Sequence, residues 1–129
     1  MNKICIMSIL LLFSISTESY ADHCPSPDTI RHRKLSQKYE WTVAENTTLQ
    51  NLLSAKKLYA VRIMDHDDYV SCHYTTDKWP IKLDMSPSSG KCKPVPHSSK
   101  WKNTDSGQVV CMEKDIANCD FNFECKQEQ

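Results

Sequence analysis

The sequence predicts a mainly-β fold: a small antiparallel sheet with at most one short helix, cross-linked by three disulfides. Three observations predict it. Several short segments alternate apolar and polar residues with the period of two that is typical of half-buried strands. Turn-forming residues separate these segments. Six of the seven cysteines lie beyond an N-terminal export signal, and an even number in an exported chain of this size is typical of a disulfide framework.

The first 21 residues have the pattern of a signal peptide. Lys3 supplies a positive charge, an almost unbroken apolar stretch runs over residues 4–15, and Ser19 and Ala21 place small side chains before the cleavage point. The apolar stretch is shorter than the ~20 residues of a membrane-spanning helix. The sequence therefore predicts cleavage after Ala21, a single mature domain over residues 22–129 without a transmembrane segment, and a secreted or periplasmic location.

The predicted cleavage removes Cys5 and leaves the cysteines that we expect to pair: Cys24, Cys72, Cys92, Cys111, Cys119 and Cys125. Their spacing contains no Cys-x-x-Cys pair, which argues against a zinc site. The sequence leaves the pairing open, although Cys111 and Cys119 are the pair most easily joined by a local loop. Cross-links of this kind stabilise a domain whose apolar core is small.

The elements before residue 57 include a strand and the one expected helix. Residues 22–37 form a polar lead-in, where Pro25 and Pro27 argue against helical geometry. The alternation over residues 39–43 predicts a strand. Residues 46–48 offer helix-capping side chains, and the leucines that follow share one helical face, so a short helix is expected over residues 47–56.

The clearest element is a hairpin, with arms over residues 58–64 and 69–75 joined by a polar turn. In its second arm Cys72 shares a face with two apolar neighbours, so we expect Cys72 to point into the core. A loop is expected over residues 86–90. The later strands are expected over residues 81–85, 92–95 and 108–113. Pro94 and Pro96 confine the second of these to a sheet edge.

Several of these features resemble one family. They are an N-terminal Cys-Pro pair, an aromatic strand, a Val-x-Cys-x-Tyr arm, a late tryptophan and a cysteine-containing tail: Cys24-Pro25, Trp41, Val70, Cys72, Tyr74, Trp101 and Phe121 to Cys125. In these the chain resembles domain-of-unknown-function family 3757, small exported proteins of Gram-negative bacteria. The resemblance covers most of the mature chain and implies an exported β-rich domain. The family has no assigned activity, so it implies no catalytic residues.

The charge balance argues against a nucleic-acid partner. The formal net charge of the chain is zero, and the predicted cleavage removes one base, Lys3, and one acid, Glu18. Proteins that bind nucleic acids normally carry a basic excess, because counterion release from phosphates drives their affinity. We therefore expect no nucleic-acid partner.

The weak metal candidates lie in the hairpin turn: Asp65, His66, Asp67 and Asp68. Carboxylates beside an imidazole suit manganese or zinc. A solvated turn is the competing interpretation, because aspartate is a preferred turn residue. The segment also lacks the spacing of a calcium loop, so we expect no metal and no cofactor.

Catalysis is disfavoured. His73 and His97 are the two residues to test for a small nuclease-like hydrolase, because acid–base cleavage of RNA requires two imidazoles near one phosphate. No Gly-x-Ser-x-Gly sequence marks a serine nucleophile. Disulfide formation would consume every candidate thiol.

The aromatic residues favour a binding protein. Trp79 lies between Lys78 and Pro80, and Trp101 lies between two lysines, so both are candidate surface residues. Aromatic side chains are common at binding hot spots. The sequence favours a non-catalytic module that binds a protein, an envelope component or a glycan. The alternatives are the histidine-based hydrolase and a disulfide-rich protease inhibitor that presents the loop Pro87–Lys91.

Overall fold

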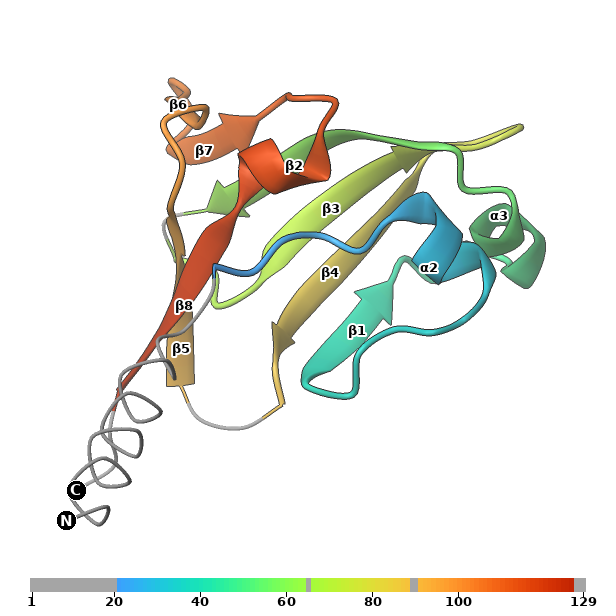
Figure 1. Cartoon of the computed structure of the whole chain (residues 1–129), viewed down its shortest axis with the longest axis horizontal. Coiled ribbons are helices and arrows are strands. Elements are labelled where there is room, and N and C mark those ends of the chain that lie inside the picture. Colours follow the sequence, from blue (N-terminus) through green and yellow to red (C-terminus); the bar gives the residue numbers. More distant parts are fainter. Residues whose placement is uncertain (1–20, 65, 89–90, 127–129) are drawn as a thin grey trace, which may run out of the picture.

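The structure is a computed structural model that describes residues 21–64, 66–88 and 91–126. A six-stranded antiparallel sheet has the order β1-β4-β3-β2-β7-β6, and a two-stranded sheet pairs β5 with β8 (Figure 1). The strands are β1 (Tyr39–Val43), β2 (Lys57–Met64), β3 (Val70–Thr75), β4 (Ile81–Pro87), β5 (Lys91–Pro96), β6 (Lys102–Asn103), β7 (Gln108–Cys111) and β8 (Phe121–Lys126). The mainly-β prediction is confirmed.

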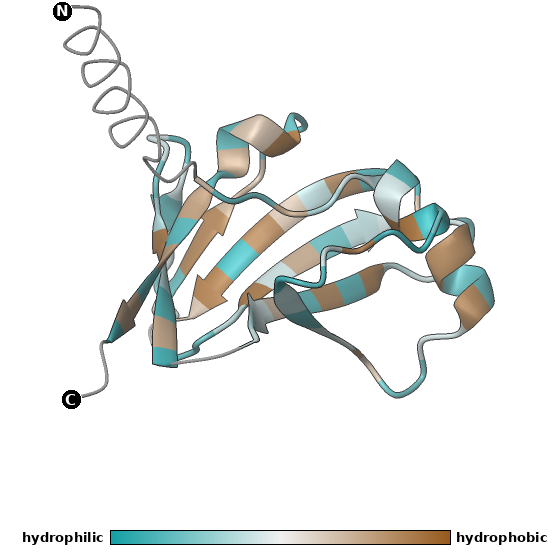
Figure 2. Ribbon diagram, turned by 60° about the horizontal axis from the view of Figure 1, so that its bottom comes forward, coloured by the Kyte–Doolittle hydropathy of each residue, from teal (hydrophilic) through white to brown (hydrophobic). Residues whose placement is uncertain are grey.

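The predicted hairpin forms the centre of the large sheet. β2 and β3 pair antiparallel with Val61 opposite Cys72, and β4 continues the sheet with Leu83 opposite Cys72. The Cys72 side chain is fully buried, as its alternation predicted. Figure 2 shows strands of the sheet with alternating hydrophobic and hydrophilic bands, and β4 has this pattern in its sequence, because successive side chains point to opposite faces of a sheet.

Two short helices and one 3-10 turn complete the described part of the chain: α2 (Pro27–Arg31), α3 (Leu49–Leu53) and η1 (Ile116–Cys119). The sequence predicted at most one helix and missed α2. Pro27 occupies the first turn, where its missing N–H needs no partner, and the Ser26 hydroxyl accepts a hydrogen bond from the Thr29 amide. The expected helix over 47–56 is present as the shorter α3, capped by Thr48.

The core lies on one face of the large sheet. The N-terminal segment, α2, η1 and β8 cross this face (Figure 1), and their residues Cys24, Ile30 and Phe121 join the buried side chains of the strands. The largest fully buried side chains are Tyr74 and Phe121. The chain therefore buries one face of the sheet with segments from both of its ends.

Three disulfides hold these covering segments in place, which confirms the predicted framework. Cys24–Cys72 joins the N-terminal segment to β3, Cys92–Cys125 joins β5 to β8, and Cys111–Cys119 joins β7 to η1 across the short local loop. Such a framework indicates an oxidising compartment outside the cytoplasm. The predicted signal peptide lies outside the described residues except for Ala21. Within the described ranges, no helix is long and apolar enough to cross a membrane.

Candidate functional site

The two predicted surface tryptophans lie in different environments. Trp79, in the loop between β3 and β4, is 73% exposed. Trp101 is half-buried against the core, and its indole nitrogen donates a hydrogen bond of 2.8 Å to the Asp120 carbonyl. Trp79 lies in the same pocket as residues of α3, whereas Trp101 directly precedes β6 at the opposite end of the molecule (Figure 1). The two rings therefore do not form one surface.

The loop that carries Trp79 is held by local bonds. The Thr76 hydroxyl donates to the Trp79 carbonyl at 2.5 Å and accepts from the Lys78 amide at 3.1 Å. The Asp77 carboxylate forms an ion pair with Lys56 at 2.6 Å. The two hydrogen bonds lie within the loop, and the ion pair joins the loop to the residue just before β2. The indole is thus presented to solvent from a positioned loop, which lowers the entropy cost of binding.

A pocket of about 560 Å³ lies beside Trp79. The pairing of Lys57 with Thr75 creates it, because this register brings the chain before β2 next to the chain after β3. The helix α3 comes just before β2, and the Trp79 loop comes just after β3. The lining is rich in amides and hydroxyls: Asn46, Thr48, Gln50, Asn51, Ser54, Asp77, Lys78 and Trp79.

The amide side chains of this pocket are available to a ligand. Asn51 uses its backbone amide to bond the Thr48 hydroxyl and its carbonyl to accept from Ser54. Among the described residues, the side-chain amides of Asn46, Gln50 and Asn51 have no hydrogen-bond partner. Residues 46–48 were expected to cap a helix, and no pocket was predicted at them. The amide-rich composition around α3 was a signal for this site, but its proximity to Trp79 depends on the strand register.

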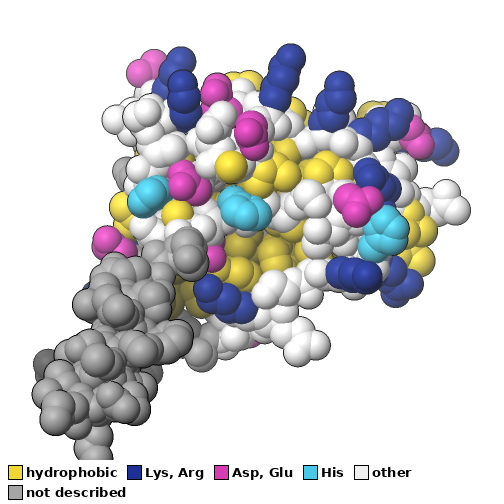
Figure 3. Space-filling model, in the orientation of Figure 1, with side chains coloured by type: hydrophobic (Ala, Val, Ile, Leu, Met, Phe, Trp, Pro, Cys, Tyr) yellow, Lys and Arg dark blue, Asp and Glu magenta, His cyan; other side chains and the backbone are white. Residues whose placement is uncertain are grey.

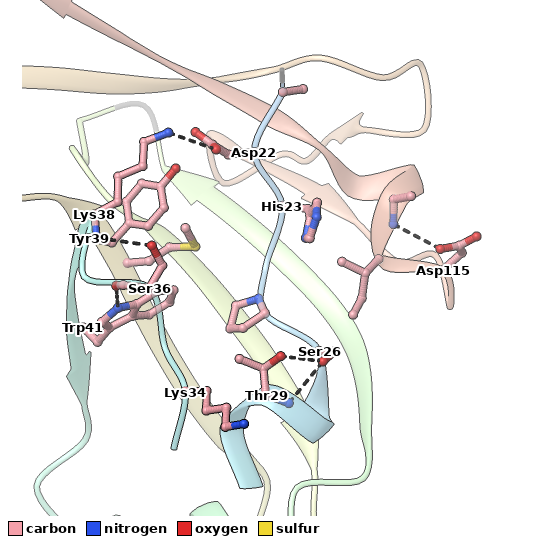
Figure 4. A pocket seen from close by; sticks show the side chains of 15 residues that line it. Asp22, His23, Ser26, Thr29, Lys34, Ser36, Lys38, Tyr39, Trp41 and Asp115 are labelled. Carbon is pink, nitrogen blue, oxygen red and sulfur yellow. Dashed lines mark hydrogen bonds and ion pairs between the residues drawn. The ribbon is translucent and has the colours of Figure 1, made fainter. Parts of the chain in front are cut away.

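A second pocket, of about 550 Å³, lies between the N-terminal segment, the chain before β1, β1 itself and η1. Apolar side chains gather in this hollow beside the N-terminal segment (Figure 3). Figure 4 shows Tyr39 and Trp41 on one side of it and His23 and Asp115 on the other. Trp41 was predicted on a strand, and no pocket was predicted beside it.

The polar groups of this second pocket mostly bind one another. Lys38 pairs with Asp22 at 3.6 Å, and the Trp41 indole donates to the Ser36 carbonyl at 2.8 Å (Figure 4). The buried Tyr39 hydroxyl, by contrast, has no hydrogen-bond partner among the described residues. Burial, with the nearby Asp22 carboxylate, raises the pKa of Tyr39 well above its usual value. This arrangement mainly fastens the N-terminal segment to β1.

The two candidate catalytic histidines lie in different parts of the fold. His73 lies on β3, on the face opposite Cys72, with its ring 5.8 Å from the ring of Tyr59. Burial, Arg62 and Lys82 lower the pKa of His73 to about 4. His97 follows β5 and pairs with Asp120, with 2.9 Å between Nδ1 and Oδ2. No contact among the described residues brings the two imidazoles to one substrate position.

The remaining candidates are only partly described. Asp65 lies outside the described residues, as do residues 89–90 of the candidate inhibitor loop. Within the described part of the chain, no three His, Cys, Asp or Glu side chains form a group that could hold a metal ion. The six cysteines Cys24, Cys72, Cys92, Cys111, Cys119 and Cys125 are all in disulfides.

The fold and its surface define a disulfide-stapled, mainly-β scaffold with exposed aromatic side chains. Comparison with known proteins adds no relative: no protein-family model, curated protein or solved structure matches the chain.

Proposed function

We propose that this chain is the precursor of an exported, non-catalytic binding module whose ligand contacts the Trp79 pocket. The observation that carries the proposal is the 73% exposure of the Trp79 side chain on a loop held by Thr76 and by the Lys56–Asp77 ion pair. Exposing a large aromatic ring to water costs free energy, and burial of the ring against a ligand would recover it. Disulfide cross-links keep such a surface rigid outside the cytoplasm.

The contacts of Asp22 support export with cleavage after Ala21. The Asp22 amide donates to the Phe121 carbonyl at 2.7 Å, and the Phe121 amide donates to the Asp22 carbonyl at 2.8 Å. Cleavage at the predicted site would therefore leave a mature chain that begins with its first sheet-like contact. A secreted or periplasmic destination and the resemblance to domain-of-unknown-function family 3757 stay predictions.

Processing can be measured directly. The protein is expressed in a Gram-negative bacterium and recovered from the periplasm and the medium. N-terminal sequencing is expected to begin at Asp22, and alkylation without prior reduction is expected to modify no cysteine in the intact mass. A retained leader, or six alkylated sulfhydryls, would overturn the exported, disulfide-bonded form.

Binding is tested by chemical cross-linking and capture from the compartment in which the mature protein accumulates. Trp79→Ala is expected to fold normally and to lose the captured material. Met112→Ala is the matched control, because Met112 is also an exposed large apolar residue, at 65%, and does not line the Trp79 pocket. Equal capture by the wild type and Trp79→Ala would remove Trp79 from the binding surface.

A further inference from the structure

Resting on the proposed function, we infer that the Trp79 pocket binds an uncharged pyranose sugar of a glycan. One pocket of about 560 Å³ holds the exposed indole and three amide side chains that have no partner among the residues that the structure describes. This volume falls within the roughly 300–1,000 Å³ range of small-molecule sites. The chemistry of each part of the lining matches one part of a sugar.

The indole matches the apolar face of the sugar ring. One face of a pyranose presents mainly C–H groups, which leave water favourably when they pack on a flat aromatic surface. Trp79 offers such a surface, because its side chain is 73% exposed. Its indole N–H has no partner among the described residues, so the ring also retains a hydrogen-bond donor.

The amides match the hydroxyl groups at the edge of the ring. Each sugar hydroxyl both donates and accepts a hydrogen bond, and a side-chain amide carries both a donor and an acceptor. Asn46, Gln50 and Asn51 supply three such amides, none of which has a partner in the described part of the chain. The sugar hydroxyls need such partners when they are buried, because a buried polar group without a hydrogen bond costs free energy.

The charges of the pocket favour an uncharged ligand. Among the described residues that line the pocket, Asp77 carries the one carboxylate, and it is paired with Lys56 at 2.6 Å. Lys78 is the remaining charged group of the lining. An isolated surface lysine interacts weakly in water and is screened by salt. The amides of the lining can therefore bind the hydroxyl groups of a neutral ligand, whereas the lining offers little to bind a charged ligand.

A protein partner is the competing occupant. The side chains of Leu49 and Leu53 are 49% and 42% exposed on α3, yet neither lines the Trp79 pocket. A protein interface needs about 800 Å² on each partner and would extend from Trp79 across these leucines. The three side-chain amides that line the pocket with the indole favour the sugar, which is smaller and rich in hydroxyl groups.

The test is a titration of the mature protein with methyl pyranosides and short neutral oligosaccharides at millimolar concentration. Tryptophan fluorescence and the NMR signals of the side-chain amides report binding. We expect a shift of the emission maximum and perturbed amide signals from Asn46, Gln50 and Asn51. Trp79→Ala is expected to weaken binding at least about tenfold, and Gln50→Ala or Asn51→Ala about fivefold each.

Leu53→Ser is the matched control on α3 and is expected to leave sugar affinity unchanged. Absence of binding by every sugar would overturn this inference, as would sugar binding that survives Trp79→Ala. If no sugar binds but capture of a protein still requires both Trp79 and Leu53, the proposed binding function stands and its ligand is a protein. If capture is also unaffected by Trp79→Ala, both proposals fall.

Discussion

The Tyr74 hydroxyl donates a hydrogen bond of 2.6 Å to the carbonyl oxygen of Pro25. This bond lies close to the Cys24–Cys72 disulfide, because Pro25 directly follows Cys24 and Tyr74 lies on the same strand as Cys72. The two links attach the N-terminal segment to the centre of the large sheet. Tyr74 is fully buried, and burial raises the pKa of its hydroxyl well above the usual value. The hydroxyl therefore stays a donor throughout the physiological pH range.

Tyr74→Phe is expected to lower the free energy of unfolding by about 1–2 kcal/mol. The substitution keeps the packed ring and removes only the bond to the Pro25 carbonyl. Urea unfolding measures the loss. Tyr59→Phe is the control, because Tyr59 lies partly exposed on β2, and it should change stability by less than about 0.5 kcal/mol. Equal stability of Tyr74→Phe and wild type would contradict a structural role for this bond.

The disulfides are expected to contribute unequally. Cys24–Cys72 links residues 48 apart in sequence, whereas Cys111–Cys119 links residues only 8 apart. Because a longer closed loop restricts the unfolded chain more, we expect a loss of roughly 4 kcal/mol for the first and roughly 2.5 kcal/mol for the second. Double serine variants, compared by denaturant unfolding, measure both. A greater loss for the short loop would contradict this order.

The two tryptophans outside the strands are expected to differ in their effect on stability. Trp101→Ala removes a ring packed against the core and its bond to Asp120, so we expect a loss of about 2–3 kcal/mol. Trp79→Ala removes an exposed ring and should change stability by about 0.5 kcal/mol or less. Thermal unfolding of both variants checks this. A large loss for Trp79→Ala would indicate that its ring is structural.

The strand pattern could be predicted from sequence because burial on a sheet follows a local period of two. Residues 39–43 and 69–75 show that period, residues 58–64 form an apolar and β-branched segment, and the strands β1, β2 and β3 include nearly all of these residues. Cys111 and Cys119 could be paired because few residues separate them. The helix α2 was missed because Pro27 argues against a helix interior yet fits the first turn.

The candidate site could be predicted only in part because tertiary contacts decide it. Trp79 and Trp101 both have lysine neighbours, and nothing local distinguishes the exposed ring from the half-buried one. The amides around α3 approach Trp79 because Lys57 pairs with Thr75. That register depends on the whole hairpin, including an irregularity between Leu58 and Ala60. The sequence therefore shows which amide residues lie around α3, but it does not show that they lie beside Trp79.

His73 gives the fold a dependence on pH in the mildly acidic range. Burial lowers its pKa to about 4, with further lowering by Arg62 from β2 and Lys82 from β4, while Asp84 from β4 partly opposes them. The ring also packs against Tyr59, and its Nε2 atom has no hydrogen-bond partner among the described residues. Charging this imidazole is therefore unfavourable in the folded state.

The unfolded chain binds a proton at His73 near the usual pKa of 6.5, and the folded chain does so only near 4. The stabilisation by neutral His73 is therefore fully present above pH ~6.5 and is lost as the pH falls toward 4. We expect a loss of about 1 kcal/mol, because solvent screens a half-exposed ring. Unfolding of wild type and His73→Asn across this range isolates the effect, since their other titrating groups are shared. A stability difference that does not change with pH would show that His73 titrates normally.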